Sequence, residues 1–167
     1  HGHKTGFYLD QKQNHEILAQ LIFDVYKGSP DISVLNLFSY TGRFGLGTSG
    51  HVINVDASHD ALELAEKNYQ LSGFPEEAVE FIQADVFEQL HDYAAEGKPF
   101  YIVILDPPKC AHNAGQIENA ARGYKDINLH AFKCVKPGGH LMTFSCSGAI
   151  TADLFQKIVF GALADSG

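Results

Sequence analysis

The sequence predicts one α/β domain over residues 1–167 with three layers: a mainly parallel sheet and helices on both of its faces. Two observations support this architecture. Short apolar runs rich in β-branched residues alternate with stretches of helical spacing, which is the pattern of right-handed βαβ crossovers. The hydrophobic fraction of 45% and the mean hydropathy of -0.10 are typical of a globular chain that buries one core.

Five strands are expected where β-branched and aromatic residues form short runs between turn signals. They are Val34–Phe38, His51–Val55, Val79–Gln83, Phe100–Leu105 and His140–Ser145. Sheets of this kind bind ligands beyond the carboxyl ends of their strands, where the strand order reverses. The residues that directly follow each strand are therefore the first candidates for a functional site.

Two helices have clear capping residues at their start. Ser58 is placed to cap a helix whose apolar face consists of Ala61, Leu62, Ala65 and Tyr69. Thr151 is placed to cap the last helix, whose apolar residues are Leu154, Phe155, Ile158 and Val159.

Two further helices lie between these. A short one is predicted over Val86–Ala95 and a longer one over Gln116–Val135, with Gly123 as a break. Pro137-Gly138-Gly139 predicts a turn between the long helix and the last strand.

Charge and cysteine content narrow the classes of protein. The formal net charge of -8, from 20 acidic and 12 basic residues, argues against tight non-specific binding of nucleic acid. The three cysteines, Cys110, Cys134 and Cys146, lack C-x-x-C spacing, which favours a reduced, cytoplasmic setting. We expect no metal site, since His1 and His3 have no third ligand nearby. We expect no membrane span, since no apolar run approaches the roughly 20 residues that one requires.

Groups suited to a nucleotide ligand follow all five predicted strands. The first strand leads into the glycine-containing turn of NLFSYTGRFG, where backbone can approach a ligand closely. Asp56 can accept hydrogen bonds from both hydroxyls of a ribose, and Asp85 can reach the amine of an adenine whose ring packs on Val86. The fourth strand ends at Asp106-Pro107-Pro108 and the fifth at Ser145-Cys146-Ser147. Each group alone could be a loop or capping residue, but five in succession point to one ligand.

These stretches carry a resemblance to a known family. The chain resembles class I S-adenosylmethionine-dependent methyltransferases, and more narrowly the bacterial ribosomal large-subunit RNA (cytosine-5-)methyltransferases. The matching stretches are GHKTGFYLDQ (Gly2–Gln11), NLFSYTG (Asn36–Gly42), VDAS (Val55–Ser58), ADVF (Ala84–Phe87), ILDPPK (Ile104–Lys109), RGYKDIN (Arg122–Asn128) and TFSCSG (Thr143–Gly148). The resemblance implies a Rossmann-like methyltransferase fold with S-adenosyl-L-methionine as cofactor and ribosomal RNA as substrate.

The resemblance also implies a role for each site residue. The turn holding Ser39, Thr41 and Gly42 goes to the methionine part of the cofactor. The other implied cofactor contacts are Asp56 at the ribose, Asp85 and Val86 at the adenine, Asp106 and Pro107 at the floor between cofactor and target base, and also Ser58 and Gln11. Cys146 falls on the catalytic cysteine of the family.

A thiol beside an acid suits methylation at carbon 5 of a pyrimidine. A thiolate that adds to carbon 6 makes carbon 5 nucleophilic enough to take a sulfonium methyl group. We assign Cys146 as the nucleophile and Asp106, held by the double proline, as the acid that stabilises the charged ring. Cys134 is expected in the core, and Cys110 is a minor rival for a chemical role.

Other functions stay open on the sequence. Uridine carbon 5 methylation uses the same thiol chemistry, and purine amino methyltransferases also carry Pro-Pro, although they place an aromatic residue where Lys109 stands. Two non-enzymatic interpretations are an inactive cofactor-binding fragment and a nicotinamide-binding fold without activity. The chain lacks the motif G-x-G-x-x-G, which argues against nicotinamide binding. RNA phosphate or the flipped base could be contacted by Lys109, Arg122, Tyr124 and Lys125. The alternative is that Arg122 and Lys125 are solvated helix residues.

The chain also departs from the family pattern. Arg43 replaces a usual glycine, and the segment from Phe44 to Asp56 is about four residues shorter, close to one helical turn. We expect the family's N-terminal RNA-binding domain and final strand pair to be absent. The strand His140–Ser145 would then be a sheet edge beside Cys146, open to pairing in a homodimer.

Overall fold

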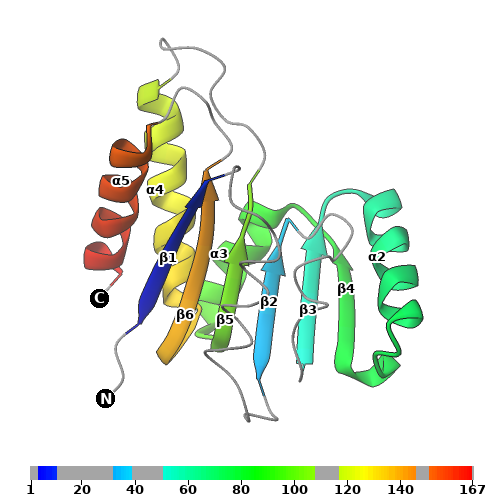
Figure 1. Ribbon diagram of the computed structural model, residues 1–167. Helices are drawn as coiled ribbons and strands as arrows, with labels where there is room; N and C mark the ends of the chain where they lie inside the picture. Colours follow the sequence, from blue (N-terminus) through cyan, green and yellow to red (C-terminus); the bar gives the residue numbers. More distant parts are fainter. Residues whose placement is uncertain (1–3, 11–31, 39–50, 108–116, 146–150, 167) are drawn as a thin grey trace.

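A computed structural model describes residues 4–10, 32–38, 51–107, 117–145 and 151–166, in which six strands form one sheet. The strands are β1 (Thr5–Asp10), β2 (Ser33–Leu37), β3 (His51–Asp56), β4 (Val79–Gln83), β5 (Phe100–Leu105) and β6 (Val135–Ser145). Their order in the sheet is β1-β6-β5-β2-β3-β4 (Figure 1). Every neighbouring pair is parallel, so all six carboxyl ends lie at one edge. The order reverses between β2 and β5, which is where ligands bind in such sheets.

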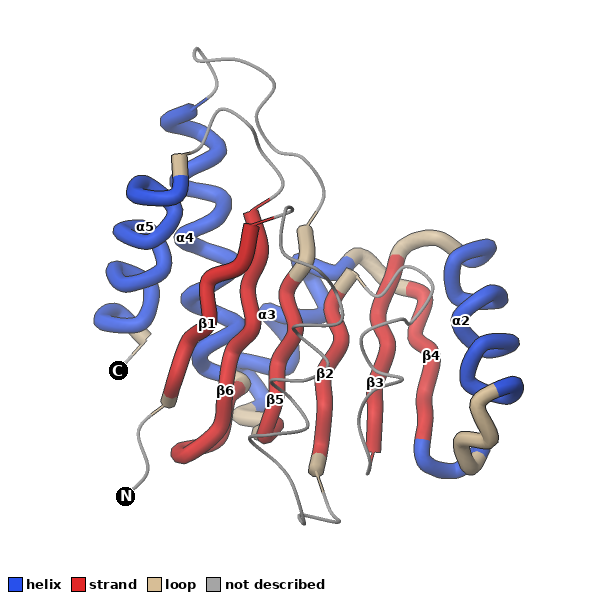
Figure 2. Tube along the Cα trace, in the orientation of Figure 1, coloured by secondary structure: helices blue, strands red, loops and turns tan. Residues whose placement is uncertain are grey.

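Helices cover both faces of the sheet, as the sequence predicts. They are α2 (His59–Leu71), the short 3₁₀ helix η2 (Glu76–Ala78), α3 (Val86–Glu96), α4 (Ile117–Lys133) and α5 (Ala152–Asp165). Helices α3, α4 and α5 pack on one face, whereas α2 packs on the other (Figure 2). The two cores follow the alternation of strand residues: Leu35 and Leu37 face the three helices, and Val34 faces the α2 side.

The predicted capping residues are confirmed. The Ser58 hydroxyl accepts a hydrogen bond from the Ala61 N–H at 3.2 Å, and the Thr151 hydroxyl accepts one from the Leu154 N–H at 3.2 Å. Each bond satisfies one of the amide groups that a helix start leaves without an intrahelical partner.

The expectation that the last predicted strand forms a sheet edge is wrong. Residues Thr5–Asp10, which the sequence analysis did not assign as a strand, form β1 and pair with β6 from Thr5↔His140 to Asp10↔Ser145. The Lys4 Nζ also donates a hydrogen bond to the Phe132 carbonyl oxygen at 2.7 Å, in the last turn of α4. The exposed-edge argument for a homodimer therefore fails, because β6 lies inside the sheet.

Gly123 does not break the long helix: α4 runs from Ile117 to Lys133 without interruption. A glycine costs only about 1 kcal/mol in a helix, and the burial of Ala120, Tyr124 and Ile127 against the sheet outweighs this cost.

The predicted turn Pro137-Gly138-Gly139 lies inside β6. There it forms an irregularity, because the register jumps from Phe100↔Val135 to Ile102↔His140. Gly138 has a φ of +86°, a conformation that side chains disfavour.

Candidate active site

Asp56 ends β3 and is buried at the carboxyl edge of the sheet. Its Oδ1 accepts a hydrogen bond from the Ser58 N–H at 2.9 Å, and its carbonyl oxygen accepts one from the Ala84 N–H at 3.1 Å. Ser58 in turn caps α2. Backbone N–H groups of Ser58 and Ala84 thus hold Asp56, the residue predicted to bind the ribose, in place.

Asp85 lies at the neighbouring strand end and caps α3, where its Oδ1 accepts a hydrogen bond from the Glu88 N–H at 3.1 Å. Val86, expected to pack on an adenine, is buried in the core between the sheet and the helices. The next residue, Phe87, is 42% exposed and was missed by the sequence reasoning. An aromatic residue two positions after an acid at a strand end was the available signal.

A cavity of about 290 Å³ lies between the start of α3, the end of β5 and the middle of α4. Its walls are mainly apolar and consist of Phe87, Pro107, Asn119, Ala120, Gly123, Tyr124 and Ile127. The cavity therefore brings together Pro107, which the sequence analysis assigned to the site, and Phe87, which it did not. Asp106, half-buried, directly precedes Pro107.

Phe38 contacts Phe87, one of the residues that line the cavity. Its ring meets the Phe87 ring edge-on, with centroids 5.6 Å apart and planes at 74°. Among the described residues it is the one non-glycine with a positive φ, 58°. A bulky residue in this conformation is strained, and such strain gathers at binding sites.

Asn36 and Asn54 form a buried polar pair on the α2 side of β2 and β3. The Asn36 Nδ2 donates to the Asn54 Oδ1 at 3.0 Å. Burial raises the pKa of the nearby Tyr69 hydroxyl to about 12, although the polar Asn54 side chain beside it partly opposes this. These groups link α2 to the two central strands beneath the candidate site.

Several predicted site residues lie outside the described residues: Gln11, Ser39, Thr41, Gly42 and Cys146, together with Arg43, Lys109 and Cys110. The described strand ends beside them do have a fixed relation. Leu105 at the end of β5 pairs with Thr143 of β6, so Asp106 follows a strand that runs alongside the one leading to Cys146.

Cys134 is confirmed as a core residue. It is fully buried, and burial raises the pKa of its thiol to about 12, despite the opposing effect of nearby Lys4. A thiol with this pKa carries almost no thiolate at neutral pH, so it is unsuited to attack a base.

Two of the residues considered for RNA contact have structural roles. Tyr124 belongs to the core and meets Phe155 edge-on, and Lys125 forms an ion pair with Asp165 at 2.8 Å that joins α4 to α5. Arg122 is exposed. No helix among the described residues is long and apolar enough to cross a membrane.

The groups around the cavity fit an adenosyl ligand. Apolar and aromatic walls suit a purine ring, and carboxylates at Asp56 and Asp85 suit hydroxyl and amine donors. A six-stranded parallel sheet with acids at successive strand ends defines the class I methyltransferase architecture expected from the sequence.

The comparison with known families agrees. A family profile described as a methyltransferase domain matches residues 29–163. The chain belongs to this family, the class I S-adenosylmethionine-dependent methyltransferases, and its cofactor is S-adenosyl-L-methionine.

Individual curated proteins share a higher sequence identity with this chain than the solved structures do. Ribosomal RNA large subunit methyltransferase I of Shewanella amazonensis is 48% identical over 170 residues, covering 99% of this chain and 41% of the relative. The protein of the same name from Aliivibrio fischeri is 48% identical over 169 residues, with the same coverage. The chain thus spans about 41% of the length of these curated relatives.

Solved structures share the fold. A methyltransferase from Agrobacterium tumefaciens, described as SAM-dependent, superimposes with a TM-score of 0.71 at 22% identity, over 89% of this chain and 48% of that chain. Another methyltransferase, in complex with SAH, superimposes with a TM-score of 0.71 at 20% identity, over 86% of this chain and 39% of that chain. At such identities the likeness concerns the fold alone.

Proposed function

We propose that the whole protein to which this chain belongs methylates carbon 5 of a cytosine in ribosomal RNA, with Cys146 as a covalent nucleophile. The observation that carries the proposal is the parallel pairing of β5 with β6. It sets Asp106 at the end of one strand beside the strand that leads to Cys146. The name of the relatives at 48% identity, ribosomal RNA large subunit methyltransferase I, supports the RNA substrate.

The chemistry divides between two side chains. The Cys146 sulfur, as thiolate, forms a bond to carbon 6 of the cytosine, and the ring electrons move toward carbon 5. Asp106 stabilises the charge at ring nitrogen 3 by donating a proton or a hydrogen bond. S-adenosyl-L-methionine supplies the electrophilic methyl group. After carbon 5 takes this group, with S-adenosylhomocysteine as the leaving group, a base removes the carbon 5 proton and the carbon–sulfur bond breaks. Any proton donated to nitrogen 3 returns to Asp106, which restores the aromatic ring, the carboxyl group and the thiolate.

The remaining residues position and shield the reaction. Asp56, Asp85 and the cavity beside Phe87 would hold the adenosyl group at the carboxyl edge. Ser39, Thr41 and Gly42 would hold the methionine part, and Gln11 would be a further cofactor contact. The target base has to leave its stack to reach carbon 6, since a paired base hides that atom.

The test uses the full-length parent protein, unmodified ribosomal RNA and a labelled methyl donor. We expect Cys146→Ala to abolish turnover while retaining affinity for S-adenosylhomocysteine, and the matched variant Cys110→Ala to keep most activity. Mapping the labelled base by mass decides among cytosine, uridine carbon 5 and a purine amine. Equal turnover in Cys146→Ala and the parent would refute the covalent mechanism. Cofactor binding with no labelled base in the full-length protein would favour a binding role without catalysis.

A further inference from the structure

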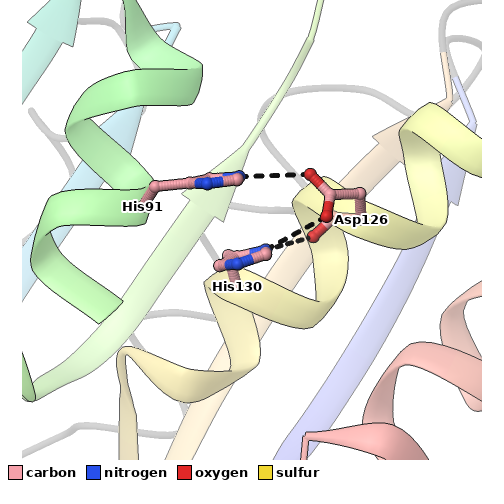
Figure 3. A group of neighbouring side chains, drawn as sticks. All are labelled: His91, Asp126 and His130. Carbon is pink, nitrogen blue, oxygen red and sulfur yellow. Dashed lines mark hydrogen bonds and ion pairs between the residues drawn. The ribbon is translucent and has the colours of Figure 1, made fainter. Parts of the chain in front are cut away.

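Three side chains far from the strand ends converge on the outer surface of α3 and α4 (Figure 3). The His91 Nε2 lies 3.1 Å from the Asp126 Oδ2, across the two helices. The His130 Nδ1 lies 3.5 Å from the Asp126 Oδ1 and 2.8 Å from the Asp126 carbonyl oxygen, one turn along α4. The two imidazole rings stack with centroids 3.8 Å apart and planes at 11°.

These distances match a metal site. One ligand atom from each of the three residues lies within 4.8 Å of the others. Zinc binds imidazole nitrogen and carboxylate oxygen at about 2.0–2.2 Å, so tetrahedral donors are about 3.4 Å apart. The two contacts made by the Asp126 carboxylate already have this spacing. The two rings are stacked and nearly parallel, so binding of one ion requires both imidazoles to rotate out of the stack until their ring planes meet at the metal.

The donor set also selects the class of ion. Two imidazoles with one carboxylate suit Zn²⁺, Co²⁺, Ni²⁺ or Cu²⁺, whereas Mg²⁺ and Ca²⁺ prefer oxygen ligands. The side chains are 48%, 54% and 20% exposed for His91, Asp126 and His130, so an ion and one or two waters can enter from solvent. Metal at His130 Nδ1 would replace its hydrogen bond to the Asp126 carbonyl oxygen.

We propose that His91, Asp126 and His130 form a transition-metal site, with Zn²⁺ as the representative ion, that ties α3 to α4. Both helices also form walls of the cavity, through Phe87 on α3 and Tyr124 on α4. A bound ion therefore joins the two walls through residues other than the proposed catalytic ones. The site is independent of the reaction and does not require RNA.

The matched control lies on α2. There the His59 Nε2 meets the Glu63 Oε1 at 3.0 Å, an imidazole–carboxylate pair with no second histidine among the described residues nearby. His1 and His3 are shared by all variants, so they cannot account for a difference between them.

The experiment titrates Zn²⁺ into the protein calorimetrically at pH 7.5 and measures the visible absorption of a Co²⁺ complex. In the parent we expect one ion per chain and a rise in Tm of about 5–10 °C at a hundredfold excess over Kd. His91→Ala and His130→Ala should weaken this binding by about tenfold or more, since even loss of outer-shell partners costs that much. His59→Ala should bind as the parent does.

Two outcomes would overturn the proposal. One is the same Zn²⁺ affinity and Tm shift in His91→Ala, His130→Ala and His59→Ala. The other is that His91→Ala and His130→Ala lower the Tm without metal, while Zn²⁺ raises the Tm of these variants as much as that of the parent. The cluster would then be an ion-pair contact only. The His59 and His91 side chains are largely exposed, whereas His130 is only 20% exposed, so the folding of each variant is checked by circular dichroism.

Discussion

Asp56 is the residue whose environment is best defined at the candidate site. Its carboxylate accepts a hydrogen bond from the Ser58 N–H, and its backbone carbonyl oxygen accepts one from the Ala84 N–H. The side chain therefore has little conformational freedom. A carboxylate held in place binds a ribose without the loss of rotamer freedom that a mobile side chain would suffer.

We expect Asp56→Asn to weaken S-adenosylhomocysteine binding by about tenfold to a hundredfold, because each hydrogen bond to a charged group contributes about 1.5–3 kcal/mol. Calorimetric titration measures this. The matched variant is Asp60→Asn, an exposed acid in the first turn of α2, which should bind as the parent does. Unchanged affinity in Asp56→Asn would exclude a ribose contact at this residue.

Two buried residues should make the fold sensitive to alkali. Burial raises the pKa of Cys134 from 9.0 to about 12 and that of Tyr69 from 10.0 to about 12. The folded chain then holds protons that the unfolded chain releases, so the stabilisation is complete below about pH 9 and declines from there toward pH 12.

We therefore expect the free energy of unfolding, measured in urea, to decrease between pH 8.5 and 10.5. The decrease should be smaller in Cys134→Ala, which lacks the buried thiol, although its stability at pH 8 is lower because a cavity remains. A stability that is constant over this pH range would contradict the burial of these groups.

At the scale of the elements, α4 joins packing to the site. Its buried residues press on the sheet, yet Gly123 leaves part of the cavity wall without a side chain. The sequence pattern around Gly123 predicts a break, but the apolar face of the helix continues on both sides of it. Tertiary packing therefore outweighed local propensity.

Two glycines give opposite expectations. A Cβ at Gly123 would have no neighbour within 4 Å, so Gly123→Ala should stabilise the protein by about 0.5–1 kcal/mol. A Cβ at Gly139 would lie 2.6 Å from the Tyr101 carbonyl oxygen, so Gly139→Ala should destabilise it by about 1–3 kcal/mol. Urea denaturation measures both. A destabilised Gly123→Ala would mean that the helix surface is closed there.

At the scale of the whole molecule, β1 extends the sheet beyond β6. It pairs along its full length with β6, so that β1 and β4 are the outer strands among the described residues. Helix α5 packs beside α4 on the same side of the sheet as α3 (Figure 1). The N-terminal segment therefore belongs to the fold and protects the strand that leads to Cys146.

Deleting residues 1–10 should expose β6 as an unpaired edge and cause concentration-dependent association. Light scattering at increasing protein concentration measures this, with Lys4→Ala as the milder control, since it removes only the hydrogen bond to Phe132. A truncated chain that stays monomeric at all concentrations would mean that β1 is dispensable for protecting the sheet.

The sequence alone determined what depends on neighbours along the chain. The bounds of β4 and β5, the caps at Ser58 and Thr151 and the acids at successive strand ends follow from local patterns, because capping and strand periodicity involve residues a few positions apart. Only the tertiary structure decided which distant segments meet. The pairing of β1 with β6, the cavity beside Phe87 and the meeting of His91 with Asp126 join residues 35 or more positions apart or on separate elements. Their contacts arise from packing and chain crossover, for which no local periodicity exists.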